Sequence, residues 1–295
     1  MKKALLFWVI MLVVSTQSKG QGFELWLDND ALYYPASTDR FYSSGLELTY
    51  FSKVSTTSSG LKQWSFALRH RIYNGLSNAS PEVLDLDRPY VGYGWLSASR
   101  DRYNLDNQTI FRAKAALGWM GSGAGGAYVQ NQFHALLENS GEAYGWDRQL
   151  QDMPIIQMEA SHSWFAESNY IAIGADAGAA LGSLTTNAFV GGQIYTGLLD
   201  QPFSLRSNKV SFIQLHGTVK AVAVGYDATL QGSPFLEDPN ALSVNQIAHG
   251  RVETGLFLES QWKGLHISTG FQWMSPEIKG LPGHRFGTIR VGYFF

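Results

Sequence analysis

The sequence predicts an all-β protein, a twelve-stranded antiparallel transmembrane β-barrel with a short helix in one extracellular loop. Three observations predict this class. The N-terminus has the pattern of an export signal, many segments alternate apolar and polar side chains, and we count about twelve such segments, an even number. The chain also has 9 Trp, 14 Tyr and 17 Phe, which suit the two aromatic girdles of an outer-membrane barrel.

Residues 1–20 have the order of a signal peptide. Lys2 and Lys3 precede the apolar run 4–14, and the polar stretch STQSKGQG follows. The apolar run is shorter than the ~20 residues that a membrane-spanning helix needs. We therefore expect residues 1–20 to be a cleaved signal and residues 21–295 to form one barrel domain in the bacterial outer membrane.

The strand segments are long and alternate with a period of two residues. In segment 62–73, Trp64 and Phe66 point to one face, whereas Gln63 and Arg69 point to the other. A secreted β-sandwich or small soluble barrel also alternates, but long strands with charges largely on one face favour the membrane barrel. The chain ends TIRVGYFF, typical of a terminal barrel strand. The expected strands lie near 23–28, 43–53, 62–73, 90–100, 107–120, 154–166, 169–182, 186–197, 210–225, 247–262, 264–275 and 284–295.

The charge and the cysteine content exclude several classes of partner and site. The formal net charge is −2, and removal of the three lysines in residues 1–20 makes the remainder more acidic, which argues against binding to nucleic acid. Cysteine is absent, so disulfides and thiolate metal sites are excluded.

A glycine-rich loop precedes the predicted helix. Gly121, Gly123 and Gly126 satisfy the G-x-G-x-x-G spacing of a dinucleotide-binding loop. That motif requires a parallel βαβ unit, which an exported antiparallel barrel lacks. We therefore predict a tightly turned extracellular loop and no nucleotide.

The segment after these glycines predicts a short amphipathic helix. From Ala127 apolar residues recur at helical spacing, and Gln130, His134 and Glu138 fall on one face at i, i+4 and i+8. A carboxylate beside His134 could orient the imidazole or help to bind a cation. The alternative is an ordinary surface histidine on a loop.

Acidic and amide side chains lie at the rim of the predicted barrel. Asp28, Asn29 and Asp30 end the first strand, and such hard oxygen ligands suit calcium, although Asx residues also end strands by forming turns. The Asp87–Arg88 pair precedes a later strand, where the default expectation is a structural salt bridge.

Four motifs together resemble the outer-membrane lipid A 3′-O-deacylase family. They are NDA…TDRFYSSGL, DRPYVGY, QNQFH and GWDRQL, in this order between residues 27 and 150. The resemblance implies a twelve-stranded barrel with calcium as cofactor. It also implies hydrolysis of the ester that holds the acyloxyacyl group at the 3′ position of lipid A.

The resemblance assigns roles to particular residues. His134 corresponds to the general base that activates water, Asn29 and Asp30 to an active-site pair, and Ser43 to a position where relatives often have threonine. Asp30, with Glu138 or Glu142, would bind the metal. The implied partners are lipid A or lipopolysaccharide in the outer membrane, and we expect a monomer.

The sequence departs from the family pattern at one loop. Some relatives carry a lysine there, but NGLSNASPEVLDL has none. We expect either that Arg69, Arg71 or Arg88 binds the lipid phosphate or that phosphate binding is weaker. The GWDRQL motif is retained, and we interpret it as an anchor between a loop and a strand.

Two other functions are compatible with an outer-membrane barrel. One is a serine-dependent esterase or phospholipase using His162 and Ser163, although adjacent residues of a strand face opposite sides. The other is a non-enzymatic barrel such as a pore, which requires a continuous polar path through the lumen.

Overall fold

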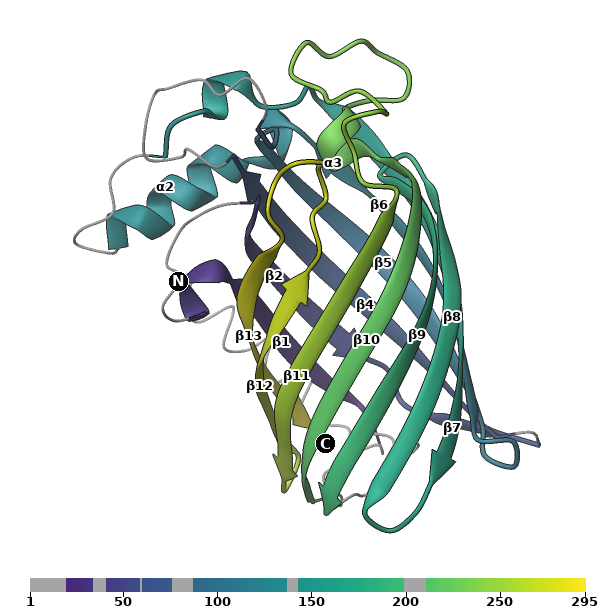
Figure 1. Cartoon of the computed structure of the whole chain (residues 1–295). Helices are drawn as coiled ribbons and strands as arrows, with labels where there is room; N and C mark the ends of the chain where they lie inside the picture. Colours follow the sequence, from purple (N-terminus) through teal and green to yellow (C-terminus); the bar gives the residue numbers. More distant parts are fainter. Residues whose placement is uncertain (1–19, 34–40, 59, 76–86, 137–142, 199–210) are drawn as a thin grey trace.

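The computed structural model describes residues 20–33, 41–58, 60–75, 87–136, 143–198 and 211–295. It is a closed antiparallel barrel (Figure 1), in which β1 pairs with β13 and β2 pairs with β4. The short β3 (Ser55–Thr57) pairs only with the start of β4, so twelve of the thirteen strands form the wall. These are β1 (Gly22–Asn29), β2 (Phe41–Phe51), β4 (Gly60–Asn74), β5 (Val91–Asn104), β6 (Thr109–Met120), β7 (Met153–Glu167), β8 (Ile171–Gly182), β9 (Thr185–Leu198), β10 (Phe212–Asp227), β11 (Gly250–Trp262), β12 (Leu265–Met274) and β13 (His284–Phe294).

Each of the twelve expected segments overlaps one wall strand, which confirms the predicted fold class. The short elements outside the wall are η1 (Asp30–Leu32), η2 (Ser122–Ala124), α2 (Gly126–Leu136), η3 (Trp146–Arg148) and α3 (Ala228–Gln231). No helix in the described part of the chain is long and apolar enough to cross a membrane.

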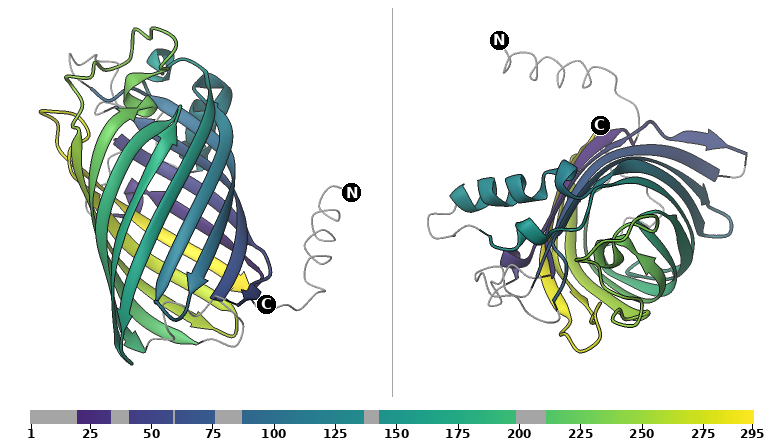
Figure 2. Two further views of the ribbon diagram at one scale, coloured as in Figure 1. Left: turned by 90° about the vertical axis from the view of Figure 1, so that its right-hand side faces the viewer. Right: turned by 90° about the horizontal axis from the view of Figure 1, so that it is seen from above.

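The two ends of the barrel differ in their connections. Tight turns join β5 to β6, β7 to β8 and β11 to β12 at one end, where Gly22 also pairs with Phe294. The helices and the connections that carry them lie at the opposite end (Figures 1 and 2). Because outer-membrane barrels have short periplasmic turns and longer extracellular loops, the end with the helices is extracellular.

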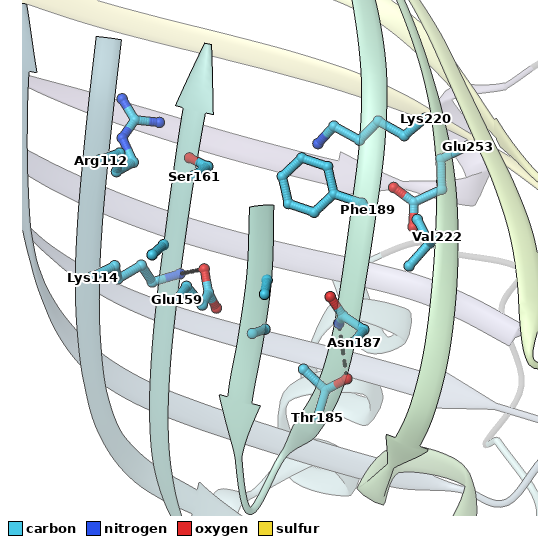
Figure 3. A pocket seen from close by; sticks show the side chains of 13 residues that line it. Arg112, Lys114, Glu159, Ser161, Thr185, Asn187, Phe189, Lys220, Val222 and Glu253 are labelled. Atoms are coloured by element: carbon cyan, nitrogen blue, oxygen red, sulfur yellow. Dashed lines mark hydrogen bonds and ion pairs between the residues drawn. The ribbon is translucent and has the colours of Figure 1, made fainter. Parts of the chain in front are cut away.

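The wall is apolar outside and polar inside. On β4, Trp64, Phe66 and Leu68 are 43%, 50% and 57% exposed on the outer face. The lumen contains ion pairs, such as Lys114 with Glu159 at 3.0 Å, which contributes to the lining of a cavity of about 330 Å³ (Figure 3). The alternation predicted for these strands therefore separates a lipid-facing surface from a hydrated interior.

The extracellular end of the lumen contains an apolar core. α3 lies over this opening in the view from above (Figure 2), and a contiguous cluster of buried side chains packs below it. A pore requires a continuous polar path, so this cluster is evidence against the pore alternative. Its members are Tyr42, Tyr73, Val91, Tyr93, Trp95, Ala116, Met120, Leu150, Met153, Ile155, Leu184, Ala228 and Phe286.

A buried ionic network joins the extracellular connections. Arg88 is 1% exposed, and its Nε donates to Glu277 at 3.1 Å. Arg251 also contacts Glu277 at 3.3 Å and Asp227 at 2.9 Å. Arg88 further donates to the hydroxyl of Thr229 in α3 at 2.9 Å. The network therefore connects the segment before β5, the α3 connection and the loop between β12 and β13.

The expected Asp87–Arg88 salt bridge is wrong. Asp87 accepts a hydrogen bond from the backbone N–H of Arg88 at 2.7 Å, whereas the guanidinium points inward to Glu277 and lies 3.9 Å from the centre of the Tyr73 ring. A fully buried guanidinium needs a buried carboxylate, and Glu277, far away in sequence, provides it.

Candidate functional site

The first strand divides its polar residues between the two faces of the wall. Phe23 and Leu25 are exposed to lipid, and Asn29 follows on the same face by strand alternation. Asp28 faces the lumen, where it accepts hydrogen bonds from Tyr42 at 2.8 Å and Thr288 at 2.7 Å. The expected rim cluster is therefore wrong for Asp28, which turns away from Asn29.

The chain leaves β1 over the outer surface of the barrel. The side chain of Asn29 caps η1 by accepting from the Ala31 N–H at 2.8 Å, and Asp30 begins this turn with 3% of its surface exposed. A Cβ at Gly287 would lie 2.5 Å from the Cβ of Leu32, so this glycine allows η1 to pack on β13. Gly287 shares the lipid-facing side of β13 with the exposed Ile289, which places η1 outside the barrel.

Ser43 lies next to this turn on the neighbouring strand. Asn29 pairs with Ser44, and the next positions along the two strands are Asp30 and Ser43. The register between β2 and β4 shifts at this point, between Tyr42 and Ser44, which is a β-bulge. Ser43 is 2% exposed, and among the described residues its Oγ has no hydrogen-bond partner, so the bulge presents a buried hydroxyl that can still accept a ligand.

The first turn of α2 packs directly on the outer surface of β5, and glycine residues on both elements allow this close contact. A Cβ at Gly92 would lie 2.8 Å from the Cα of Gly126, so the two backbones are in direct contact. On the other side Trp146 packs over Gly126, and its indole N–H donates to the amide oxygen of Gln130 at 2.7 Å. Tyr90 holds Trp146 in turn, with ring centres 5.6 Å apart.

His134 lies one helical turn beyond Gln130 on the same face of α2. Gln130 is 5% exposed and His134 is half-buried, whereas Val129 and Phe133 on the other side are 43% and 46% exposed. The predicted helix and the shared face of Gln130 and His134 are therefore confirmed. Glu138 and Glu142, the two predicted metal ligands from this loop, lie outside the described residues.

The structure brings most of the predicted site to one rim of the barrel. α2 packs against β4 and β5, and η1 packs against β13 and β2. In both figures α2 and η1 lie on the same outer side of the extracellular end. Asn29, Ser44, Ile72 and Gly92 form one row of paired residues across β1, β2, β4 and β5. Three strand spacings of about 4.8 Å therefore place the base of α2 roughly 14 Å from Asn29 around the wall.

The glycine-rich loop before α2 has a structural role. Gly121 has φ of 101° and leads into η2. Asp152 accepts hydrogen bonds from the Gly123 N–H at 2.7 Å, Ser122 Oγ at 2.5 Å and Trp119 Nε1 at 3.0 Å. Partial burial raises the pKa of Asp152, but these hydrogen bonds lower it below its usual value overall. The Gly123 N–H, which a bound phosphate would need as a donor, already donates to the Asp152 carboxylate. This agrees with the prediction that the loop binds no nucleotide.

The oxygen donors at the rim fit a hard cation. The amide oxygen of Asn29, the buried carboxylate of Asp30 and the buried hydroxyl of Ser43 are ligand types that calcium accepts. Within the described residues, no group of three histidine, aspartate or glutamate side chains is close enough to hold a metal.

The three arginines predicted to bind a lipid phosphate do not face the site. Arg69 forms an ion pair with Glu47 in the lumen, Arg71 lies 5.0 Å from the centre of the lumen-facing Tyr42 ring, and Arg88 is buried in the ionic network. Strand alternation explains the first two, because odd-numbered residues of β4 point inward.

The serine-esterase alternative lacks the geometry it needs. His162 stacks beside Trp164, with ring centres 4.5 Å apart, on the outer face of β7. Ser163 pairs with Asp176 on the opposite, lumen-facing side of the wall. The wall therefore separates the two side chains, as the sequence predicted.

The contact between Trp146 and Gln130 is the part of the site that the sequence did not specify. The GWDRQL motif does anchor a loop, since the Leu150 N–H donates to the Tyr90 carbonyl at 2.9 Å. Its tryptophan, however, also positions the face of α2 that carries His134. The signal in the sequence that could have predicted this contact is Gln130, an amide side chain on the same face of the predicted helix as His134.

Comparisons with known proteins agree with this architecture. In the structural comparison, LpxR from Salmonella typhimurium has a TM-score of 0.77 at 19% identity, covering 93% of this chain and 100% of that one. The β-domain of the Bordetella autotransporter BrkA has a TM-score of 0.51 at 11% identity, covering 95% and 100%. No curated protein sequence matches. The family described as outer membrane protein LpxR matches residues 4–295. The chain therefore belongs to the LpxR family of outer-membrane proteins.

Proposed function

We propose that this outer-membrane protein is a calcium-dependent ester hydrolase that removes the 3′-linked acyloxyacyl group of lipid A. One observation supports this most: Asn29, Asp30 and Ser43 are neighbours at the extracellular ends of β1 and β2, on the side of the barrel from which α2 projects with His134. Family membership supports the same activity. A site at the extracellular rim lies beside the outer leaflet of the membrane.

In the proposed reaction, His134 accepts a proton from water, and the water oxygen attacks the ester carbonyl carbon. The bond between that carbon and the 3′ oxygen of the sugar then breaks, and the proton passes to the leaving oxygen. The products are an acyloxyacyl carboxylic acid and a free sugar hydroxyl. Gln130, fixed by Trp146, orients the helix face that carries the base.

Calcium, when bound, supplies positive charge that polarises the carbonyl and stabilises the oxyanion. Asp30, with Glu138 or Glu142, would hold it, and Asn29 and Ser43 contribute neutral oxygen atoms. In this proposal Ser43 is a neutral ligand, and the nucleophile is the water that His134 activates.

The base is tested with purified protein, lipid A in detergent micelles and mass spectrometry of the products. We expect His134→Ala to slow acyloxyacyl release by about 100-fold or more, because a general base contributes that order of rate. His162→Ala is the matched control and should retain the wild-type rate. Full activity of His134→Ala, or loss of activity in His162→Ala, would refute the assignment.

The metal is tested separately from the base. A calcium chelator should abolish hydrolysis, and added calcium should restore it, whereas a serine-directed inhibitor should have no effect. Calorimetric titration of the purified protein with calcium should show weaker binding in Asp30→Asn. Chelator-resistant hydrolysis, or inhibition by the serine reagent, would instead support the esterase alternative.

A further inference from the structure

The lipid-facing surface of β4 to β8 contains a furrow lined by small residues. Trp64 pairs with Arg100, Arg100 with Ala113, Ala113 with Ala160, and Ala160 with Ala179. Directly paired residues point to the same side of a sheet, so this row runs across five strands on the outer face. The row and its neighbours enclose a cavity of about 610 Å³.

The furrow has the shape and polarity for an acyl chain. Met158 and Leu181 form part of its border and are 64% and 68% exposed, so bulky side chains stand beside the alanine row. Lys114 and Glu159 also contribute to the lining, but their charged groups pair with each other in the lumen at 3.0 Å. The surface presented to lipid is therefore apolar apart from Arg100.

Three cations lie together at one end of this furrow. Lys62 pairs directly with Arg102, and Arg100 lies two residues before Arg102 on the same face of β5. In the described part of the chain none of the three forms an ion pair, and Arg100 Nε is buried without a hydrogen-bond partner. Like charges placed directly opposite each other destabilise a sheet, and a bound anion between them would offset this repulsion.

The depth of this cluster identifies the leaflet. β5 descends from the extracellular end to Asn104, and the tight turn that follows is periplasmic. Arg100 lies close to that end, with its guanidinium 5.3 Å from the centre of the Trp64 ring. Aromatic side chains of this kind mark the membrane interface, where lipid headgroups lie.

We propose that Lys62, Arg100 and Arg102 bind the phosphate of an anionic glycerophospholipid of the periplasmic leaflet, whose acyl chain occupies the alanine furrow. Charge complementarity favours this occupant, because the cluster carries three positive charges that form no ion pair with any described residue, and it adjoins an apolar groove. The inference is independent of lipid A hydrolysis, which takes place at the opposite end of the barrel.

The test is native mass spectrometry of the purified full chain titrated with phosphatidylglycerol, compared with zwitterionic phosphatidylcholine. The wild type should bind one molecule of phosphatidylglycerol more tightly than it binds phosphatidylcholine. Each of Lys62→Gln, Arg100→Gln and Arg102→Gln should weaken binding by about fivefold. The double substitution Ala113→Leu with Ala160→Leu fills the furrow and should remove the bound lipid.

Two matched controls test specificity. Ala221→Leu changes an exposed alanine on the outer face of β10, and Arg285→Gln removes an exposed cation at the extracellular end; both should bind as the wild type does. Equal phospholipid retention in every variant would overturn the proposal. So would a dimer that is lost in the Ala113→Leu, Ala160→Leu protein, because that would make the furrow a contact between copies.

Discussion

The role of a side chain in this wall depends on the face to which it points. Asp28 and Asn29 are adjacent, yet Asp28 accepts hydrogen bonds inside the lumen while Asn29 caps a turn on the outer surface. The alternation of Phe23 and Leu25 already indicates this separation in the sequence. The two residues are adjacent in the sequence motif, but consecutive residues of a strand point to opposite faces. Only residues on the same face can therefore be chosen as ligands of one metal ion.

Glu277 allows a prediction about pH. Burial raises the pKa of this carboxyl, but Arg88 and Arg251 lower it to about 2 overall. A depressed pKa stabilises the folded state above the unfolded value of 4.5, and this contribution is lost as pH falls toward 2. We therefore expect the stabilisation that Glu277 itself contributes to fall by about 3 kcal/mol across this window.

Urea unfolding of the detergent-solubilised protein at several pH values measures this loss. Glu277→Gln should be less stable than the wild type at pH 7, because Arg88 and Arg251 lose a buried partner. The difference between the two proteins should shrink as the pH falls below 4.5. A difference that stays constant would show that the network contributes no proton linkage.

At the scale of elements, the long strands were predictable and the short turns were not. Twelve segments with a clear period of two residues became the twelve wall strands. The three residues of β3 and the four of α3 are too short for a periodic signal. Their placement depends on contacts distant in sequence, such as that of Thr229 in α3 with Arg88. The packing of α2 against the wall could not be predicted from the sequence either, because it depends on a backbone contact between Gly92 and Gly126.

That packing yields a prediction for the helix. Gly92→Ala would place a Cβ 2.8 Å from the Cα of Gly126 and push α2 off the wall. Because a displacement of about 1 Å can cost about 100-fold in rate, we expect lipid A hydrolysis to fall by that order while the barrel still assembles.

Gly94 provides the matched control for this change. It lies two residues along the same face of β5, but its added Cβ would meet the nearest atom, the Arg69 carbonyl oxygen, at 3.4 Å, an ordinary contact. Gly94→Ala should retain activity. Equal rates in the two variants, measured by acyl release with heat-modifiable gel mobility as the folding check, would show that the position of α2 does not matter.

The whole molecule has three distinct environments, although the residues that form each of them are dispersed along the sequence. The lumen contains paired charges, its extracellular end contains an apolar core, and the outer surface carries the candidate site at the extracellular rim. The fold class and the helix with His134 followed from the sequence. Two features became apparent only from the structure of the closed barrel. Arg69, Arg71 and Arg88 point inward, and Glu277 connects three extracellular connections through its ion pairs. Catalysis outside the wall is the central claim that follows.

Two aspartates test that claim most directly, because Asp28 faces the lumen and Asp30 begins the turn outside it. The measurement is the mass spectrum of lipid A from bacteria that produce the wild type, Asp28→Asn or Asp30→Asn, with equal amounts of folded barrel. We predict that lipid A lacks the 3′ acyloxyacyl group with the wild type and with Asp28→Asn, and keeps it with Asp30→Asn. Intact lipid A with Asp28→Asn and trimmed lipid A with Asp30→Asn would place the chemistry inside the barrel and contradict the account.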